Sequence, residues 1–309
     1  MKKKIILNIC ITYYFERDYI YELMDHIKKI KKKNNFEVLI RNDNPKQKLS
    51  LKDFKIKNLN IKIFNSENKS KGEVSSLLDL KKKSRGDFIC FVADDDLISP
   101  EFFNFFLKEK IKKSNYLCHA TPYKKYWGKK NKYKFINQKN LLKDFFSRKI
   151  YLSACVGMII KKSQINEKHI RVLKDYNLDL YLLSLISDYN LRFINYNYGY
   201  NNVKASMISS KSIDPKMYYN GIKFLKTFFD KSLYFLLYNF FMDNFYSNIF
   251  RENSKKFENI ICATKIYLLF KDDNLNKFNK IKYLILFYLK IAIKVFINFL
   301  LKLIISVKR

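Results

Sequence analysis

Three consecutive aspartates, Asp94 to Asp96, end a short apolar segment and constrain the fold of this chain more than any other feature. The segment Phe88–Ala93 is rich in aromatic and β-branched side chains, and it lies between Arg85-Gly86-Asp87 and Ser99-Pro100. These features favour a buried β-strand over a helix. Three neighbouring like charges repel one another, and a bound divalent cation would offset that repulsion. The alternative is a solvent-exposed acidic turn.

The segments before the aspartates alternate between strand and helix patterns. Hydrophobic periodicity predicts the order strand, helix, strand, strand, helix, strand over residues 5–11, 19–30, 36–40, 60–64, 73–83 and 88–93. This order predicts an α/β class with a mostly parallel sheet. Such sheets bind ligands at the carboxyl ends of their strands, which is where the aspartates would lie.

The rest of the chain has a looser pattern. We expect helices at 101–112, 139–146 and 177–186, strands at 115–123 and 191–195, and a strand or buried loop at 154–161. Beyond residue 214 the pattern is mainly that of aromatic-rich helices. We therefore expect an α/β domain over residues 1–212, a helical extension over 213–278 and a separate amphipathic helix over 279–309.

Composition limits the possible classes of protein. The chain has 309 residues, 48% of them hydrophobic, which is enough to bury a core and excludes a disordered chain. Its net charge of +33 permits binding to nucleic acid or to an anionic membrane. The abundance of Lys, Asn, Ile, Phe and Tyr, with six Gly and four Pro, also fits AT-rich coding. The net charge therefore allows binding to nucleic acid or to a membrane but does not by itself indicate either function.

Cysteine and histidine usage argues against metal sites built on these residues. The five Cys are widely spaced without a Cys-x-x-Cys pair, and the three His are scattered. This pattern predicts reduced, mostly buried thiols in a cytosolic compartment. The N-terminal Met1–Lys4 and the apolar run after it resemble a secretory signal, but no small-residue cleavage site follows. We expect this run to form the first strand.

The segment from Lys282 to Val307 is almost entirely apolar. Its polar interruptions recur every four residues, at Lys290, Lys294, Asn298 and Lys302. In a helix this spacing gives a slowly drifting polar stripe. Such a helix suits the surface of an anionic membrane, and the alternative is a helix packed on the protein itself. No run of about 18 apolar residues lacks Lys, so a spanning helix is disfavoured.

Four segments together resemble the GT-A fold of family 2 glycosyltransferases. Ile9–Tyr14 corresponds to the first turn of that family, and Glu37–Asp43 corresponds to the strand that ends in the base-binding acidic pair. Arg85–Phe91 corresponds to the lead into the metal-binding Asp-x-Asp motif, and Asp94–Pro100 to the motif itself. The order and spacing match over roughly 200 residues. The resemblance implies a Rossmann-like mixed sheet with a C-terminal helical extension.

Some positions depart from the family pattern. Thr12 stands where Pro is usual, and Tyr14 is the main remnant of the family's first turn. Asn42 replaces the first acid of the base-binding pair, which leaves Asp43 for the base. Ala93 replaces the first Asp of the Asp-x-Asp motif, so the roles within the aspartate triplet stay open.

The resemblance also implies roles for individual residues. The donor-binding residues would be Thr12, Tyr14, Asp43, Asp94 and Lys204, with Asp94 toward the ribose and Lys204 toward the diphosphate. The metal ligands for Mn²⁺ or Mg²⁺ would be Asp95 and Asp96. Asp175 would be the general base, with Asp179 in reserve. A helix N-cap is the alternative role for Asp175, and a solvated lysine is the alternative for Lys204.

We predict a metal-dependent, inverting glycosyltransferase that uses a UDP-sugar and a glycan or glycolipid acceptor. The resemblance implies a role in bacterial lipopolysaccharide or capsule biosynthesis, and the lysine-striped C-terminal helix predicts a peripheral location on the cytoplasmic face of the membrane. A nucleic-acid-binding protein is an alternative, although the sequence has no zinc-finger, RRM or KH signature. A haloacid-dehalogenase-like phosphatase is another, but its Asp-x-Asp motif follows the first strand. A catalytically inactive membrane scaffold is the third.

Overall fold

The computed structural model describes most of the first 108 residues and separate segments of the remainder. The described residues are 5–14, 19–31, 33–54, 58–67, 70, 72–94, 98, 100–108, 121–122, 135–136, 150–151, 159–167, 193–194, 219–220, 222–223, 226–227, 231–239, 242, 256–270, 278, 281–282, 284–286, 288–289, 291–293 and 296. The chain divides into two compact units, Met1–Ser209 and Ser210–Arg309, and each is described by itself.

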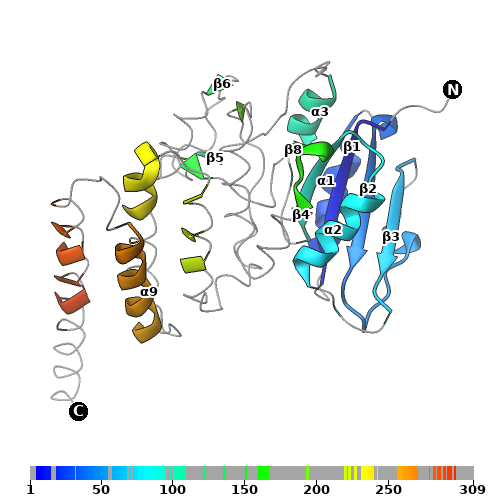
Figure 1. The fold of residues 1–309 in the computed structure, drawn as a ribbon. Coiled ribbons are helices and arrows are strands. Elements are labelled where there is room, and N and C mark those ends of the chain that lie inside the picture. The colour runs from blue at the N-terminus through cyan, green and yellow to red at the C-terminus, as the bar shows by residue number, and fades with distance from the viewer. Residues whose placement is uncertain are drawn as a thin grey trace, which may run out of the picture. The chain divides into compact units, whose positions relative to one another are not determined.

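A five-stranded sheet is the centre of the first unit (Figure 1). The strands lie in the order β3-β2-β1-β4-β8, with β8 antiparallel to β4 and the other pairs parallel. Their bounds are β1 Leu7–Tyr13, β2 Phe36–Asn42, β3 Ile61–Asn65, β4 Phe88–Ala93 and β8 Ile159–Lys161. The chain order reverses on either side of β1, and parallel α/β sheets bind ligands at such a switch point.

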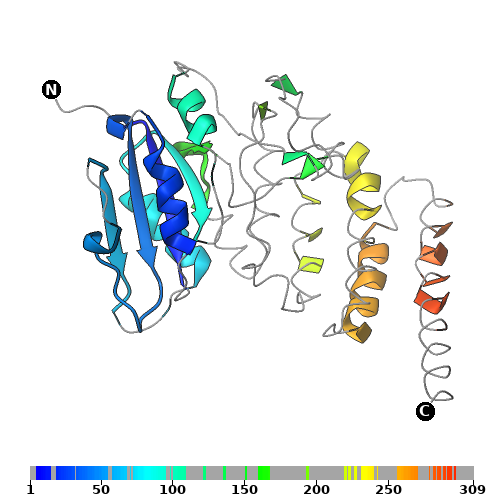
Figure 2. The ribbon, with the colours of Figure 1, turned by 180° about the vertical axis from the view of Figure 1, so that it is seen from behind.

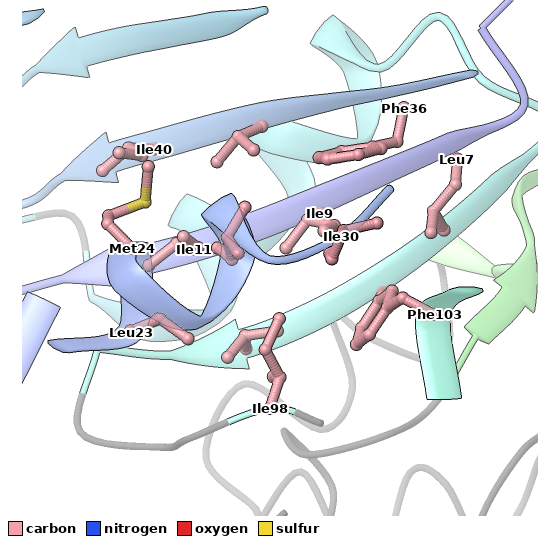
Figure 3. Packing of buried hydrophobic residues seen from close by; sticks show 14 of the residues in the cluster. Leu7, Ile9, Ile11, Leu23, Met24, Ile30, Phe36, Ile40, Ile98 and Phe103 are labelled. Carbon is pink, nitrogen blue, oxygen red and sulfur yellow. The ribbon is translucent and has the colours of Figure 1, made fainter. Parts of the chain in front are cut away.

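One face of this sheet packs against α1 (Tyr19–Lys28) and α3 (Pro100–Lys108) (Figure 2). Alternate residues of β1 point into this core, because successive side chains of a strand face opposite sides. Figure 3 shows these side chains meeting those of the two helices and of β2, and the labelled members are Leu7, Ile9, Ile11, Leu23, Met24, Ile30, Phe36, Ile40, Ile98 and Phe103. Each such buried side chain contributes about 1.5–3 kcal/mol.

The opposite face carries α2 (Glu73–Lys83) (Figure 1). A buried polar cluster lies on the same face at the amino ends of the strands. Glu37 is fully buried, and its carboxylate accepts hydrogen bonds from Arg85 at 2.6 Å, Lys62 at 3.0 Å and Asn8 at 3.0 Å. Burial alone would raise the pKa of Glu37, but these hydrogen bonds outweigh it and lower the pKa. The cluster therefore keeps a charged carboxylate inside the sheet.

Gly86 completes this cluster because the backbone passes very close to Asn8 there. The Gly86 N–H donates to Asn8 Oδ1 at 2.5 Å. A Cβ at this position would lie 2.7 Å from Asn8 Oδ1 and 2.9 Å from the carbonyl oxygen of Ile6. The Arg85-Gly86 pair before β4 thus has a structural role in closing the amino-terminal edge of the sheet.

The observed elements confirm the predicted order from β1 to β4. β1 and β2 each extend two residues further than expected, to Tyr13 and Asn42, because they pair with each other along their whole length. The remaining 3₁₀ segments and short strands are η1 Lys33–Asn35, η2 Leu51–Phe54, η4 Lys162–Gln164, β5 Thr121–Pro122, β6 Phe135–Ile136, β7 Ile150–Tyr151 and β9 Phe193–Ile194. The expected helices at 139–146 and 177–186 lie outside the described residues.

The described cysteines agree with the prediction of buried thiols. Cys10, Cys90 and Cys262 are all buried. Burial raises the pKa of the Cys10 thiol to about 12, so this side chain is an inert part of the interior.

Aromatic packing holds the second unit together. The ring of Phe270, which follows α9 (Lys256–Leu269), meets Tyr234 edge-on at 5.6 Å and Tyr238 at 5.9 Å. Tyr234 and Tyr238 lie in the helical turns after η6 (Lys231–Leu233). This confirms the expected helical, aromatic-rich character of the described part of residues 215–270.

The segment 278–296 is helical at its described positions and leaves one apolar side exposed. Ile285, Leu289 and Ile293 are 59%, 52% and 50% exposed and follow one another at four-residue intervals. Another side contacts α9, where the Tyr288 hydroxyl lies 2.7 Å from that of Thr264. Among the described residues, no helix has both the length and the apolar character needed to cross a bilayer.

We predict that Glu37 makes stability depend on pH. Because its pKa is lower when folded than when unfolded, its stabilising contribution is complete above the unfolded value of 4.5 and is lost as pH falls through the folded pKa. Glu37→Gln should lower the free energy of unfolding by about 2–3 kcal/mol at pH 7. Denaturant unfolding at pH 7 and below pH 4 measures this difference, which should shrink at acid pH. The exposed Glu67→Gln is the control, and an equal loss at both pH values would contradict the prediction.

Candidate functional site

Strand pairing brings two predicted donor-binding aspartates to the same edge of the sheet. β1 pairs through Tyr13 with Asn42 of β2 and through Thr12 with Ala93 of β4. The residues that follow these strands therefore leave the sheet side by side. The Asp43 N–H donates to the Tyr13 carbonyl at 2.7 Å, and the Tyr14 N–H donates to Asp94 Oδ2 at 3.4 Å. The end of β1 thus contacts both aspartate positions.

The carboxylate of Asp43 is buried and held by the loop after β3. It is 4% exposed. Ser66 Oγ donates to Oδ1 at 3.1 Å, while Ser70 Oγ and the Gly72 N–H donate to Oδ2 at 2.6 and 2.9 Å. A carboxylate accepts up to about four hydrogen bonds, so most of its capacity is engaged. Asp43 consequently fixes the path of the chain from β3 to α2.

Gly72, one of the three donors to Asp43, has a backbone conformation that favours glycine. Its φ of 80° lies in the left-handed region, where a side chain would be strained. No atom would obstruct a Cβ there, so the backbone angle and not space is the constraint. This angle aims the Gly72 N–H at Asp43 immediately before α2 begins at Glu73.

Asn42 takes a structural role at the position where the family usually has an acid. Its amide nitrogen donates to Asn65 Oδ1 at 2.8 Å and also to the Gln47 carbonyl. Its amide oxygen accepts from the Asn44 N–H at 3.0 Å. A carboxylate could not make the two donor bonds, which explains why an amide suits this turn.

Tyr14 and Thr12 lie at the accessible side of this edge. Tyr14 is 48% exposed, whereas Thr12 is half-buried near the end of β1. Both therefore lie at the same edge of the sheet as Asp43 and Asp94. Asp95, Asp96, Asp175, Asp179 and Lys204 lie outside the described residues, so their roles stay predictions.

The sequence directly after β4 has the chemistry that a hard divalent cation prefers. Asp94 begins a run of three carboxylates, and Mg²⁺ and Mn²⁺ prefer oxygen ligands of this kind. Among the described residues there is no group of three or more His, Cys, Asp or Glu that could hold a metal. The ligands expected from the sequence, Asp95 and Asp96, adjoin Asp94 and are not among those residues.

The structure adds residues that the sequence pattern did not indicate. Ser66, Ser70 and Gly72 hold Asp43, and Arg41 holds Ser66. The one local signal was the position of Gly72, directly before a predicted helix in a loop that starts at a strand end. The contacts themselves depend on the pairing of β2 with β3.

Comparison with known proteins identifies the family. The family model described as Glycosyl transferase family 2 matches residues 8–171, which is just over half of the chain. The chain belongs to glycosyl transferase family 2. The matched range contains β2, β3, β4, β8 and all of β1 except Leu7, together with Asp43 and Asp94. No curated protein matches the sequence.

Solved structures share the fold at low identity. TarS 1–349 from S. aureus, in complex with UDP-GlcNAc, gives a TM-score of 0.56 at 17% identity, over 86% of this chain and 73% of that chain. The mannosyltransferase PcManGT from Pyrobaculum calidifontis, in complex with GDP-Man and Mn²⁺, gives 0.51 at 10% identity, over 94% and 80%. With the mixed five-stranded sheet, these similarities confirm the expected GT-A class. This family 2 protein is a glycosyltransferase.

We predict that Asp43 controls the opening of the loop between β3 and α2. Asp43→Ala removes the acceptor of the Gly72 N–H, so amide exchange at Gly72 should accelerate about tenfold, as expected for one lost hydrogen bond. Hydrogen exchange followed by NMR measures this directly. The exposed Asp25→Ala, which breaks a surface pair with Lys28, is the control. Unchanged exchange at Gly72 would show that Asp43 does not hold the loop.

Proposed function

We propose that this glycosyltransferase moves a sugar from a UDP-linked donor to a glycan or glycolipid acceptor, with Mn²⁺ or Mg²⁺ and with inversion at the transferred carbon. The observation that carries the proposal is the position of Asp43 and Asp94 at the carboxyl edge of the sheet. Asp43 contacts Tyr13 and Asp94 contacts Tyr14, so the two aspartates lie on either side of the end of β1. A donor nucleotide needs acceptor groups for its base and ribose, and this edge supplies them. TarS, with UDP-GlcNAc, supports the choice of a nucleotide sugar.

The proposed donor pocket assigns one task to each residue. Asp43 accepts an N–H of the base, with Thr12 and Tyr14 on the neighbouring strand end. Asp94 accepts a hydroxyl of the ribose. Lys204 supplies a cation to the diphosphate. The uracil of a UDP donor presents one N–H, which can donate to Asp43 beside the three donors that the loop already supplies to this carboxylate.

The proposed metal ligands are Asp95 and Asp96. When bound there, Mn²⁺ or Mg²⁺ would offset the negative charge of the diphosphate as the bond to the sugar breaks. The structure of PcManGT is a complex with both GDP-Man and Mn²⁺, which supports a divalent cation for this chain. Without such a cation, the aspartates at this edge would repel a diphosphate.

The proposed chemistry is a direct displacement. The acceptor hydroxyl oxygen bonds to the anomeric carbon while the bond from that carbon to the diphosphate oxygen breaks. The hydroxyl proton passes to the carboxylate of Asp175, or to that of Asp179 in reserve. The nucleoside diphosphate leaves with the bonding electrons. Attack from the side opposite the leaving group inverts the configuration.

We also propose that the acceptor is lipid-linked and that the protein works at the cytoplasmic face of a bacterial membrane. The exposed apolar side of the segment 278–296 supports this, because contiguous exposed apolar surface marks binding sites. Lysines at 282, 290, 294 and 302 in the same region of the sequence complement anionic headgroups. Synthesis of a lipopolysaccharide or capsule would need such an acceptor.

The donor proposal predicts metal-dependent stabilisation by a nucleotide sugar. At about 100 times the dissociation constant, UDP-GlcNAc or another UDP-sugar with Mn²⁺ should raise the melting temperature of the wild-type chain by about 5–10 °C. Asp95→Ala with Asp96→Ala should remove the Mn²⁺-dependent part of the shift. Differential scanning fluorimetry with and without Mn²⁺ measures both.

Two controls separate this proposal from non-enzymatic alternatives. Asp25→Ala, a surface change on α1, should keep the full shift. Retention on DNA should be equal in the wild type and the double variant, because it depends on the lysines and not on the two aspartates. If no nucleotide sugar stabilises the wild type while DNA does, the chain is a nucleic-acid-binding protein.

The membrane proposal predicts that the exposed apolar side of segment 278–296 is required for vesicle binding. Ile285→Gln, Leu289→Gln and Ile293→Gln together should release the protein from vesicles of phosphatidylglycerol and phosphatidylcholine, because each loses an apolar side chain about half exposed in the free protein. Flotation assays measure this. Leu51→Gln, an exposed apolar position in η2, is the control. Unchanged flotation of a folded triple variant would contradict membrane association.

A further inference from the structure

A buried arginine lies two residues before Asp43 and reaches it through a serine. Arg41 belongs to β2 and is 6% exposed. Its Nη1 donates to Asp79 of α2 at 3.2 Å, and its Nη2 donates to Ser66 Oγ at 3.2 Å. Ser66 Oγ in turn lies 3.1 Å from Asp43 Oδ1. The chain of contacts runs from α2 through the interior to the carboxylate.

The chemistry of the three groups fixes the direction of these hydrogen bonds. A guanidinium can only donate and a carboxylate can only accept, whereas a hydroxyl does both. The Ser66 hydroxyl must therefore accept from Arg41 and give its single proton to Asp43. A hydroxyl without the arginine could turn its proton elsewhere. Arg41 consequently decides which way Ser66 points.

Stability alone does not account for a charged group at this place. Arg41 Nε is buried and has no hydrogen-bond partner among the described residues. Burying an unsatisfied donor is unfavourable, and apolar residues of similar volume often replace buried ion pairs without loss of stability. The neighbouring interior position on β2 is the fully buried Leu39, so an apolar side chain fits this face of the strand.

We propose that Arg41 is a positioning residue that orients Asp43 for the base of the nucleotide donor. It acts through the Ser66 hydroxyl, and Asp79 anchors it to α2. The inference rests on the proposed role of Asp43 in donor binding. Arg41 holds the carboxylate in one orientation before the donor binds, so less conformational entropy is lost on binding. Its effect therefore falls on donor affinity and not on the chemical step.

The test uses the full chain and two variants that break different links. Arg41→Met keeps the length of the side chain but removes its donors, and Ser66→Ala removes the hydroxyl while leaving the Arg41–Asp79 pair. Each should weaken UDP binding about tenfold by calorimetry and raise the donor KM by a similar factor with kcat almost unchanged. The double variant should be no weaker than either single variant, because both break one chain.

A matched control removes the other cation of Asp79. Lys83 contacts Asp79 at 3.0 Å on the surface, outside the chain of contacts from Arg41 through Ser66 to Asp43. Lys83→Met should therefore bind UDP like the wild type. Thermal unfolding of every variant shows whether a variant that binds UDP weakly is still folded. If Arg41→Met does not fold, Ser66→Ala still tests the inference.

Amide exchange at Gly72 separates failure of this inference from failure of the proposed function. The Gly72 N–H donates to Asp43, so Arg41→Met should accelerate its exchange with or without any nucleotide. If the wild type binds no nucleotide, the proposed function fails and Gly72 exchange alone decides the role of Arg41. The inference would be overturned if a folded Arg41→Met variant bound UDP as tightly as the wild type, or if its Gly72 amide exchanged at the wild-type rate. Additive effects of Arg41→Met and Ser66→Ala in the double variant would also overturn it.

Discussion

The parallel pairing of β1 with both β2 and β4 is the constraint on which the site depends. It is continuous from Leu7 to Tyr13 on the β2 side and from Leu7 to Thr12 on the β4 side. Because all three strands run in the same direction, the residues after them emerge at one edge. Asp43 and Asp94 are 51 positions apart in the sequence but contact the adjacent residues Tyr13 and Tyr14, at the end of β1 and just after it. No local interaction could bring them together.

The two ends of the sheet carry two different polar clusters of residues. At the amino end, Glu37 is satisfied by Arg85, Lys62 and Asn8, and no ligand is needed to complete it. At the carboxyl end, the hydrogen bonds to the Asp43 carboxylate come from the segment between β3 and α2. The Arg85-Gly86 lead that resembles the family motif therefore serves folding, whereas the aspartates that follow β4 are the proposed ligands of the metal and the donor.

The sequence was sufficient for elements whose pattern is local. The bounds of α2 and β4 agree with the prediction because helical periodicity and a short apolar run define them directly. The turn signal Arg-Asn-Asp-Asn-Pro predicts that β2 ends at Ile40, but pairing with β1 and β3 carries the strand to Asn42. Arg41, which was expected in a turn, therefore lies in the interior. Its contacts with Ser66 and Asp79, 25 and 38 positions away, could not be inferred from a local pattern.

Asn42 and Asp43 are adjacent in one turn but make different kinds of hydrogen bond. Asn42 both donates and accepts, so it can bind Gln47, Asn65 and Asn44 and hold the chain after β2. Asp43 only accepts, so every group around it must be a donor, and the loop supplies two hydroxyls and one N–H. An acid at both positions would place a second carboxylate against carbonyl and amide oxygens. The departure from the family's acidic pair is therefore a consequence of how this turn is supported, and it leaves the acceptor at Asp43 intact.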